Sequence, residues 1–103
     1  MNIKSIEEKE FFPGFKGKFI HGKNISWVFW NVKKGAKVDL HKHHHEQIMY
    51  VVDGEFEFTL SGDTKIYSSG DIVLIPSNIE HSGTALKDCK LMDVFSPARE
   101  EYR

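Results

Sequence analysis

Residues 35–54 read GAKVDLHKHHHEQIMYVVDG, and this stretch carries the most informative pattern of the chain. Four of the six histidines lie within five consecutive residues of it. In an extended strand, alternate side chains point to the same face, so His41 and His43 can direct their imidazoles to one point. Gln47 has the same parity and offers an amide oxygen. These three residues are therefore candidates for one side of a metal site.

Imidazole nitrogen is a common ligand for divalent transition metals, so a His-x-His pair on one strand indicates half of a metal centre. The alternatives are a solvated surface cluster and histidines that are hydrogen-bonded in the interior. Glu46 is a more usual kind of acidic ligand, but its parity places it on the opposite face from Gln47. His45 shares the parity of the ligands and is a candidate pocket residue, whereas we expect His44 to be exposed.

The surrounding segments carry strand signals and no helical period. Glu55–Leu60 alternates strictly between polar and apolar residues, which places Phe56, Phe58 and Leu60 on one face. Further strands are expected at residues 25–32, 47–52, 64–67, 72–75, 84–86 and 90–95, with turns at 61–63 and 69–71. Short strands without helical crossovers predict an all-β chain, either an antiparallel sandwich or a small barrel.

Length and composition restrict the classes of protein to consider. The 103 residues are enough for one domain, and we treat residues 1–103 as a single unit. The net charge of −1, without a basic stripe, argues against nucleic acid as a partner. No apolar run approaches the roughly 18 residues that a membrane span needs. The first ten residues lack a secretory signal and Cys89 is the only cysteine, so we expect a cytoplasmic protein.

The first motif consists of Gly35, His41, His43, Gln47 and Gly54, separated by five, one, three and six residues. A second motif lies downstream of it. Its members are Gly70, Pro76, Asn78 and His81, separated by five, one and two residues. In the order and spacing of their members, the two motifs resemble those of the cupin family. The chain departs from the usual pattern in having Gln47 for Glu, Asn78 for Gly and Ala85 for a later Asn. Because Asn tolerates left-handed backbone angles, we expect Asn78 to replace Gly without strain.

The resemblance implies a fold and a cofactor. The fold is a cupin-type double-stranded β-helix, or jelly-roll barrel, with a core at about residues 18–95, an N-terminal arm at residues 1–17 and a C-terminal tail at residues 96–103. Inside it, one divalent transition metal ion (Mn, Fe, Co, Ni or Zn) would bind to His41, His43, Gln47 and His81. A neutral Gln in place of Glu leaves more positive charge at the metal, which makes the ion a stronger Lewis acid.

Asp93 is unusual within the strand expected at residues 90–95. Leu91 and Phe95 share its face, so a carboxylate occupies a position that normally holds a core residue. Burying it without a partner would be costly, and such a group is kept where a partner, a ligand or catalysis requires it. The alternative to a functional role is an ion pair with a lysine of the barrel or with Arg99.

The last residues, DVFSPAREEY from Asp93 to Tyr102, resemble the closing motif of small cupins of the pectin-degradation type. This resemblance implies an isomerase-like or lyase-like enzyme that opens 4,5-unsaturated uronates to the linear keto form. Asp93 would move a proton, Arg99 would bind the uronate carboxylate, and Phe95 would contact the sugar ring. The same ending occurs in cupins without an assigned substrate. A metal-dependent dioxygenase and a non-catalytic protein that binds a small ligand are therefore alternatives.

Both faces of residues 25–30 (ISWVFW) are apolar. Burial of both faces in so small a chain indicates that a second copy covers the outer face, so we expect a homodimer. The alternative is that the first twenty residues fold back over that face. The expected partners are therefore a second copy and a small-molecule ligand or substrate.

Overall fold

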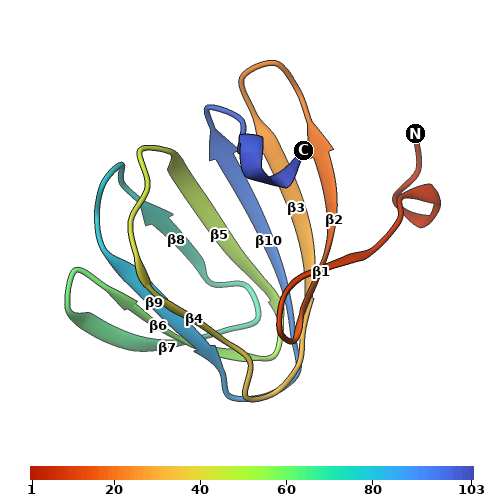
Figure 1. Ribbon diagram of the computed structural model, residues 1–103. Coiled ribbons are helices and arrows are strands. Elements are labelled where there is room, and N and C mark those ends of the chain that lie inside the picture. The colour runs from red at the N-terminus through yellow and green to blue at the C-terminus, as the bar shows by residue number, and fades with distance from the viewer.

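The computed structural model describes residues 1–103 and contains two antiparallel sheets that face each other (Figure 1). The larger sheet has six strands in the order β1-β2-β3-β10-β5-β8, and the smaller has four in the order β4-β9-β6-β7. The strands are β1 (Lys9–Phe12), β2 (Phe15–His21), β3 (Ser26–Val32), β4 (Lys37–His41), β5 (Glu46–Asp53), β6 (Glu55–Leu60), β7 (Asp63–Ser68), β8 (Ile72–Ile75), β9 (His81–Ala85) and β10 (Cys89–Ser96). Two short 3-10 helices are η1 (Ile3–Ser5) and η2 (Glu100–Tyr102). The jelly-roll barrel expected from the sequence is confirmed.

Inward side chains from both sheets form one core. Along β6, Phe56 and Phe58 are buried, as the alternation of that strand predicts, and along β3 the inward residues are Val28, Trp30 and Val32. The core cluster consists of Phe15, Val28, Trp30, Val32, Met49, Val51, Phe56, Phe58, Val73, Ile75, Ala85, Cys89, Leu91 and Phe95. The centre of the larger sheet is β10, which pairs with β3 on one side and with β5 on the other. Residues from three distant parts of the chain therefore meet on its inner face.

Two positions of the sequence motifs have backbone angles that few residues tolerate. Gly54 has a φ of +98°, and a Cβ there would lie 2.4 Å from the carbonyl oxygen of Asp88, so only glycine fits. Asn78 has a φ of 62°, which confirms the left-handed conformation expected for it. Its backbone N–H donates to the carbonyl oxygen of His43 (2.7 Å), which ties the second motif to the first.

The larger sheet extends beyond the barrel core that the sequence indicated. Strand β1 and the first three residues of β2 lie within residues 1–17, where an arm was expected, and the two strands form a hairpin at the edge of β3. The strand signal of β2 is weak because Gly17 occupies an inward position. A Cβ at Gly17 would lie 2.8 Å from the Trp30 ring, so the glycine leaves space for that side chain.

The first twenty residues do not cover the outer face of the larger sheet. Strand β2 pairs edge to edge with β3, and the Trp27 side chain on the outer face is 40% exposed. The folding-back alternative is therefore wrong for this part of the sheet. The structure contains no helix with the length and apolar character that crossing a membrane requires.

Candidate metal centre and ligand cavity

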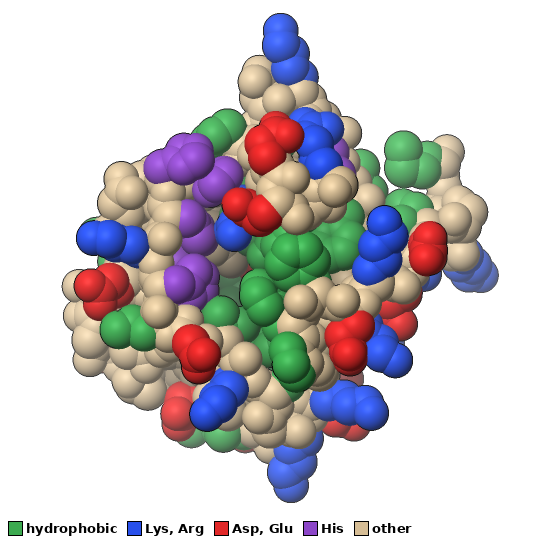
Figure 2. Space-filling view, in the orientation of Figure 1, with side chains coloured by type: hydrophobic (Ala, Val, Ile, Leu, Met, Phe, Trp, Pro, Cys, Tyr) green, Lys and Arg blue, Asp and Glu red, His purple; other side chains and the backbone are tan.

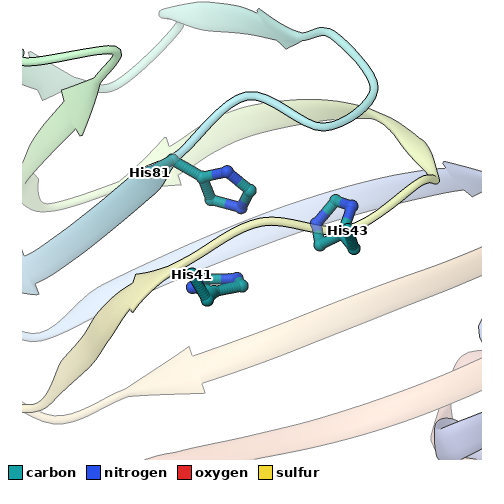
Figure 3. A group of neighbouring side chains, drawn as sticks. All are labelled: His41, His43 and His81. Atoms are coloured by element: carbon teal, nitrogen blue, oxygen red, sulfur yellow. The ribbon is translucent and has the colours of Figure 1, made fainter.

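Three histidines, two from the first motif and one from the second, converge at one end of the barrel (Figure 3). His41 is the last residue of β4 and lies directly opposite His81, the first residue of β9, with ring centroids 4.2 Å apart. The ring of His43 lies 5.7 Å from that of His41 and 4.9 Å from that of His81. One ring nitrogen of each residue lies within 4.8 Å of those of the other two. The cluster brings together residues 40 positions apart in the chain.

The sequence interpretation was wrong in one detail of this cluster. It placed His41 and His43 on one strand, but β4 ends at His41 and His43 lies in the segment that follows. His43 still faces the cluster because its carbonyl oxygen accepts the Asn78 N–H. The orientation of His43 therefore depends on a contact with the second motif and not on the alternation of a regular strand.

The hydrogen bonds of the imidazoles leave one nitrogen of each ring free to bind a cation. Nδ1 of His41 lies 2.7 Å from the carbonyl oxygen of Asp39, and Nδ1 of His81 lies 2.9 Å from that of Ile79. Nδ1 of His43 lies 2.9 Å from the carbonyl oxygen of His45. A carbonyl oxygen can only accept, so Nδ1 carries the proton and Nε2 has a free lone pair in each neutral ring. Metal-binding histidines have this arrangement.

Gln47 adds an oxygen to the three nitrogens. Its Oε1 lies 3.2 Å from Nε2 of His43, and its Nε2 donates to Oδ1 of Asp93 at 3.0 Å. An unprotonated imidazole nitrogen and an amide oxygen are both acceptors, so no hydrogen bond joins them in the neutral state. A cation would satisfy both. The set of three nitrogens and one oxygen thus fits the divalent transition metal that the sequence implied.

Burial keeps the histidines in the uncharged form that can bind metal. Burial, followed by the nearby charge of Arg99, lowers the pKa of His43 from 6.5 to about 4. Burial also lowers the pKa of His81. Both rings are therefore neutral near pH 7, and protons do not compete strongly for their free nitrogens.

Asp93 is buried beside Gln47 and accepts two hydrogen bonds from uncharged donors. Besides the Gln47 amide, the indole Nε1 of Trp30 donates to its Oδ2 at 2.9 Å. Burial raises the pKa of Asp93 from 3.8 to about 6, although both hydrogen bonds lower it. None of the ion pairs of the structure includes Asp93, and Arg99 pairs with Glu101, so the alternative of an ion pair with a lysine or with Arg99 is wrong. No pattern in the sequence indicated that Trp30 contacts this carboxylate.

A cavity of about 520 Å³ opens beside the histidines. Figure 2 shows histidine side chains along one side of a hollow whose other side is hydrophobic. His41, His81, Gln47 and Asp93 contribute polar groups to the lining, and the apolar contribution includes Phe11, Phe12, Phe56, Phe58, Phe95 and Tyr102. Its size and mixed lining are typical of small-molecule sites. Sequence reasoning did not find Phe11 and Phe12, since they lie in the segment taken for an arm.

Arg99 projects from the C-terminal tail into the lining of this cavity. Its guanidinium lies 4.9 Å from the centre of the Phe95 ring and 4.7 Å from that of Tyr102, and its side chain is only 11% exposed. Nε donates to Glu101. Burial raises the pKa of Glu101, but the hydrogen bond and charge of Arg99 outweigh this effect and lower it overall. The terminal nitrogens of Arg99 are left for an anion.

The tail is held over the cavity by the turn between β2 and β3. The backbone N–H of Arg99 donates to Oγ of Ser26 at 2.7 Å, and that hydroxyl also lies 2.8 Å from Nδ1 of His21. Nε2 of His21 lies 3.1 Å from the carbonyl oxygen of Tyr102. His21 therefore has a structural role, and it fixes the position of Arg99.

The two remaining histidines of the sequence cluster differ from each other. His44 is exposed, as expected. His45 is buried, but it is not among the residues that line the cavity, and its Nδ1 has no hydrogen-bond partner. It packs against His44, with ring centroids 4.0 Å apart, and near Phe95.

Comparison with known proteins identifies close similarities over nearly the whole chain. A family model described as "Cupin domain" matches residues 28–95. The pectin degradation protein KdgF of Dickeya dadantii is 34% identical over 97 residues, which cover 91% of this chain and 88% of that protein. The structure of KdgF from Halomonas sp. superposes with a TM-score of 0.92 at 32% identity, covering 100% of this chain and 96% of that one. An RmlC-like cupin from Shewanella frigidimarina gives a TM-score of 0.95 at 30% identity, covering 100% and 94%.

Proposed function

This chain belongs to the cupin family, and from that membership we propose that it is a metal-dependent enzyme that opens 4,5-unsaturated uronates to linear keto acids. The observation that carries the proposal is that one cavity joins the candidate metal centre to Asp93 and Arg99. Its similarity to pectin degradation proteins over most of its length favours a sugar-derived acid as the substrate.

The proposed metal ligands are His41, His43, Gln47 and His81. Mn, Fe, Co, Ni and Zn all suit three imidazoles and an amide oxygen, and the supply in the cell selects among them. When bound, the ion would supply Lewis acidity. This acidity would be stronger than in a site with a glutamate ligand, because none of the four ligands carries a negative charge. The free lone pairs at the cluster support this assignment.

The proposed reaction is an isomerisation, so the product contains the same atoms as the substrate. The hydroxyl on carbon 1 loses its proton, the bond from carbon 1 to the ring oxygen breaks, and an aldehyde forms. The released enolate then takes up this proton on carbon 4 and becomes a keto acid. We assign the proton transfer to Asp93, because a carboxylate with a pKa of about 6 can both accept and donate a proton near neutral pH. Two hydrogen bonds occupy only part of its lone-pair capacity.

We assign recognition of the uronate carboxylate to Arg99 and contact with the sugar ring to Phe95. A guanidinium binds a carboxylate through two parallel hydrogen bonds, and two aromatic rings hold that of Arg99 in one plane. Phe95 is buried in the lining between this guanidinium and the ring of His43. An unsaturated, partly flattened ring with one carboxylate would match these contacts.

The metal assignment is tested by calorimetric titration of the metal-free protein with Co²⁺. Wild type is expected to bind one ion, and His81→Ala is expected to lose most of that affinity because one of the four ligands is gone. His44→Ala is the matched control, since His44 belongs to the same run of histidines but is exposed outside the cluster. If His81→Ala and wild type bound Co²⁺ with equal affinity, the proposed metal centre would be refuted.

The reaction is tested by following the ultraviolet absorbance of the conjugated double bond of an unsaturated monouronate. Metal-loaded wild type should abolish this band. Arg99→Ala should raise KM by roughly 10²-fold or more, and Arg99→Lys should recover part of the loss, since a buried charged hydrogen bond is removed or weakened. Both variants should bind Co²⁺ like wild type, and Lys65→Ala on the exposed strand β7 should be fully active. An unchanged band with wild type would instead favour the dioxygenase or ligand-binding alternatives.

We further propose that the protein is a cytoplasmic homodimer. A single cysteine, buried and unpaired, suits a reducing compartment. The outer face of the larger sheet carries a row of apolar side chains across five adjacent strands, and neighbours in the row are paired in register: Ile20, Trp27, Val94, Ile48 and Leu74. Contiguous exposed apolar surface of this kind supports association with a second copy.

A further inference from the structure

We propose that Trp30 and Asp93 are positioning residues that fix the orientation of the Gln47 amide, and that Asp93 is the reason why this ligand is Gln and not Glu. The inference rests on the metal centre of the proposed function. A side-chain amide has an oxygen on one side and an NH₂ group on the other, and only the oxygen can bind a cation. The surroundings of Gln47 decide which of the two faces the histidines.

The hydrogen bonds through Asp93 have a fixed direction. Trp30 Nε1 donates to Oδ2 at 2.9 Å, and Gln47 Nε2 donates to Oδ1 at 3.0 Å. An indole N–H can only donate and a carboxylate can only accept, so the Gln47 NH₂ group must face Asp93. The amide oxygen is consequently turned toward His43, 3.2 Å from Nε2.

The three residues are held on adjacent strands in the interior. Trp30 lies on β3, Asp93 on the central strand β10 and Gln47 on β5, and their exposed fractions are 4%, 7% and 7%. Hydrogen bonds to a buried carboxylate are strong because the surroundings have a low dielectric constant. Turning the amide over would place its oxygen against the Asp93 carboxylate, so the buried chain selects a single orientation.

A glutamate at position 47 would lack the N–H that Gln47 donates to Asp93. Gln47→Glu would set two carboxylates about as far apart as the 3.0 Å that now separates the amide nitrogen from Oδ1. Their repulsion would destabilise the metal-free protein and offset the attraction of the new charge for a cation. We therefore expect Gln47→Glu alone to bind Co²⁺ no more tightly than wild type.

Asp93→Asn has the complementary effect. The introduced asparagine has only one oxygen, and Trp30 requires it as an acceptor, so its NH₂ group faces Gln47. The Gln47 amide then turns its oxygen to the asparagine and its NH₂ group to the histidines. Co²⁺ affinity should fall by roughly 10- to 100-fold, as for other residues that orient a metal ligand. The metal-free protein should keep nearly the stability of wild type, because every donor still has an acceptor.

Combining the two substitutions should restore both properties. In the double variant Asp93→Asn/Gln47→Glu, the asparagine donates to one oxygen of the introduced glutamate and the other oxygen faces the histidines. We expect Co²⁺ affinity to recover to the wild-type level or above it. The thermal midpoint of the metal-free protein, lowered by Gln47→Glu alone, should recover as well. Such non-additivity is the mark of directly coupled residues.

The experiment measures Co²⁺ affinity by calorimetry and the thermal midpoint of the metal-free protein for wild type, both single variants and the double variant at one fixed pH. Asp63→Asn, which neutralises an exposed carboxylate, is the control and should match wild type. The proposal is overturned if Gln47→Glu raises the affinity equally in both backgrounds, or if the double variant recovers neither property. If wild type binds no Co²⁺, the metal centre of the proposed function fails, and the thermal midpoints still decide whether Asp93 and Gln47 are coupled as described.

Discussion

At the scale of single residues, the chemistry of this protein depends on polar groups that are buried with matched partners. Asp93 occupies a core position of β10, and only its two hydrogen-bond donors make a carboxylate tolerable there. Arg99 is similarly enclosed, by two aromatic rings and one carboxylate. Both groups keep the capacity to contact a ligand because each has atoms that face the cavity.

Tyr102 gives a residue-scale prediction about pH. Burial raises its pKa to about 12, against about 10 in an unfolded chain, so the folded protein holds the phenol proton more tightly. The resulting stability is complete below about pH 10 and is lost as the pH rises toward 12. Between these values wild type should lose roughly 2–3 kcal/mol more of its unfolding free energy than Tyr102→Phe. Urea unfolding at several alkaline pH values measures this difference, and parallel curves for the two proteins would refute it.

At the scale of elements, strand β9 connects core packing with the metal centre. It begins with His81, and at its middle Gly83 faces the core side chain of Phe56. A Cβ at Gly83 would lie 2.4 Å from a ring carbon of Phe56, far inside the ordinary contact distance. The glycine therefore lets the aromatic ring of β6 pack directly against the backbone of the strand that carries a proposed ligand.

Gly83→Ala should consequently destabilise the protein. Inserting a methyl group into a packed core typically costs about 1–3 kcal/mol, because neighbouring groups must shift. Urea unfolding of the metal-free protein measures the loss. Ser82→Ala, one residue away on the opposite face of β9, is the control and should change the unfolding free energy by less than about 0.5 kcal/mol. Wild-type stability of Gly83→Ala would mean that the Phe56 ring moves aside freely.

At the scale of the whole molecule, the two faces of the larger sheet carry different kinds of side chain. The inner face supplies Gln47, Asp93 and Phe95 to the cavity. The outer face exposes large apolar side chains, including Trp27 at 40%, Ile48 at 45% and Leu74 at 56%. The proposed homodimer would cover these side chains with a second copy.

Light scattering after size-exclusion chromatography tests the homodimer. Wild type is expected at twice the mass of one chain, and Ile48→Lys should be a monomer because a charge at the centre of the apolar row would have to be buried. Ile66→Lys is the matched control: Ile66 is equally apolar and 59% exposed, but it lies on β7 of the smaller sheet. If wild type were a monomer, the proposed interface would be refuted.

Much of this protein could be predicted from the sequence because the relevant signals are local. Alternation of apolar residues fixes which side of a strand is buried, so the burial of Phe56 and Phe58 on β6 was predicted correctly. The two motifs indicated the histidine cluster and the left-handed conformation of Asn78, since their spacings encode turns and strand ends. The strands β1 and β2 were missed, since charged residues and an inward glycine interrupt their alternation. Strand β4 was expected only around His41.

Only the tertiary structure decided which partners the buried polar groups have. Trp30, Gln47 and Asp93 are far apart in the chain and meet because β10 lies between β3 and β5. No local pattern states that an indole will donate to a carboxylate 63 residues away, or that this carboxylate will in turn orient an amide. Hydrogen-bond direction is a property of groups in contact, and contact between distant residues is determined by the order of strands in the sheet.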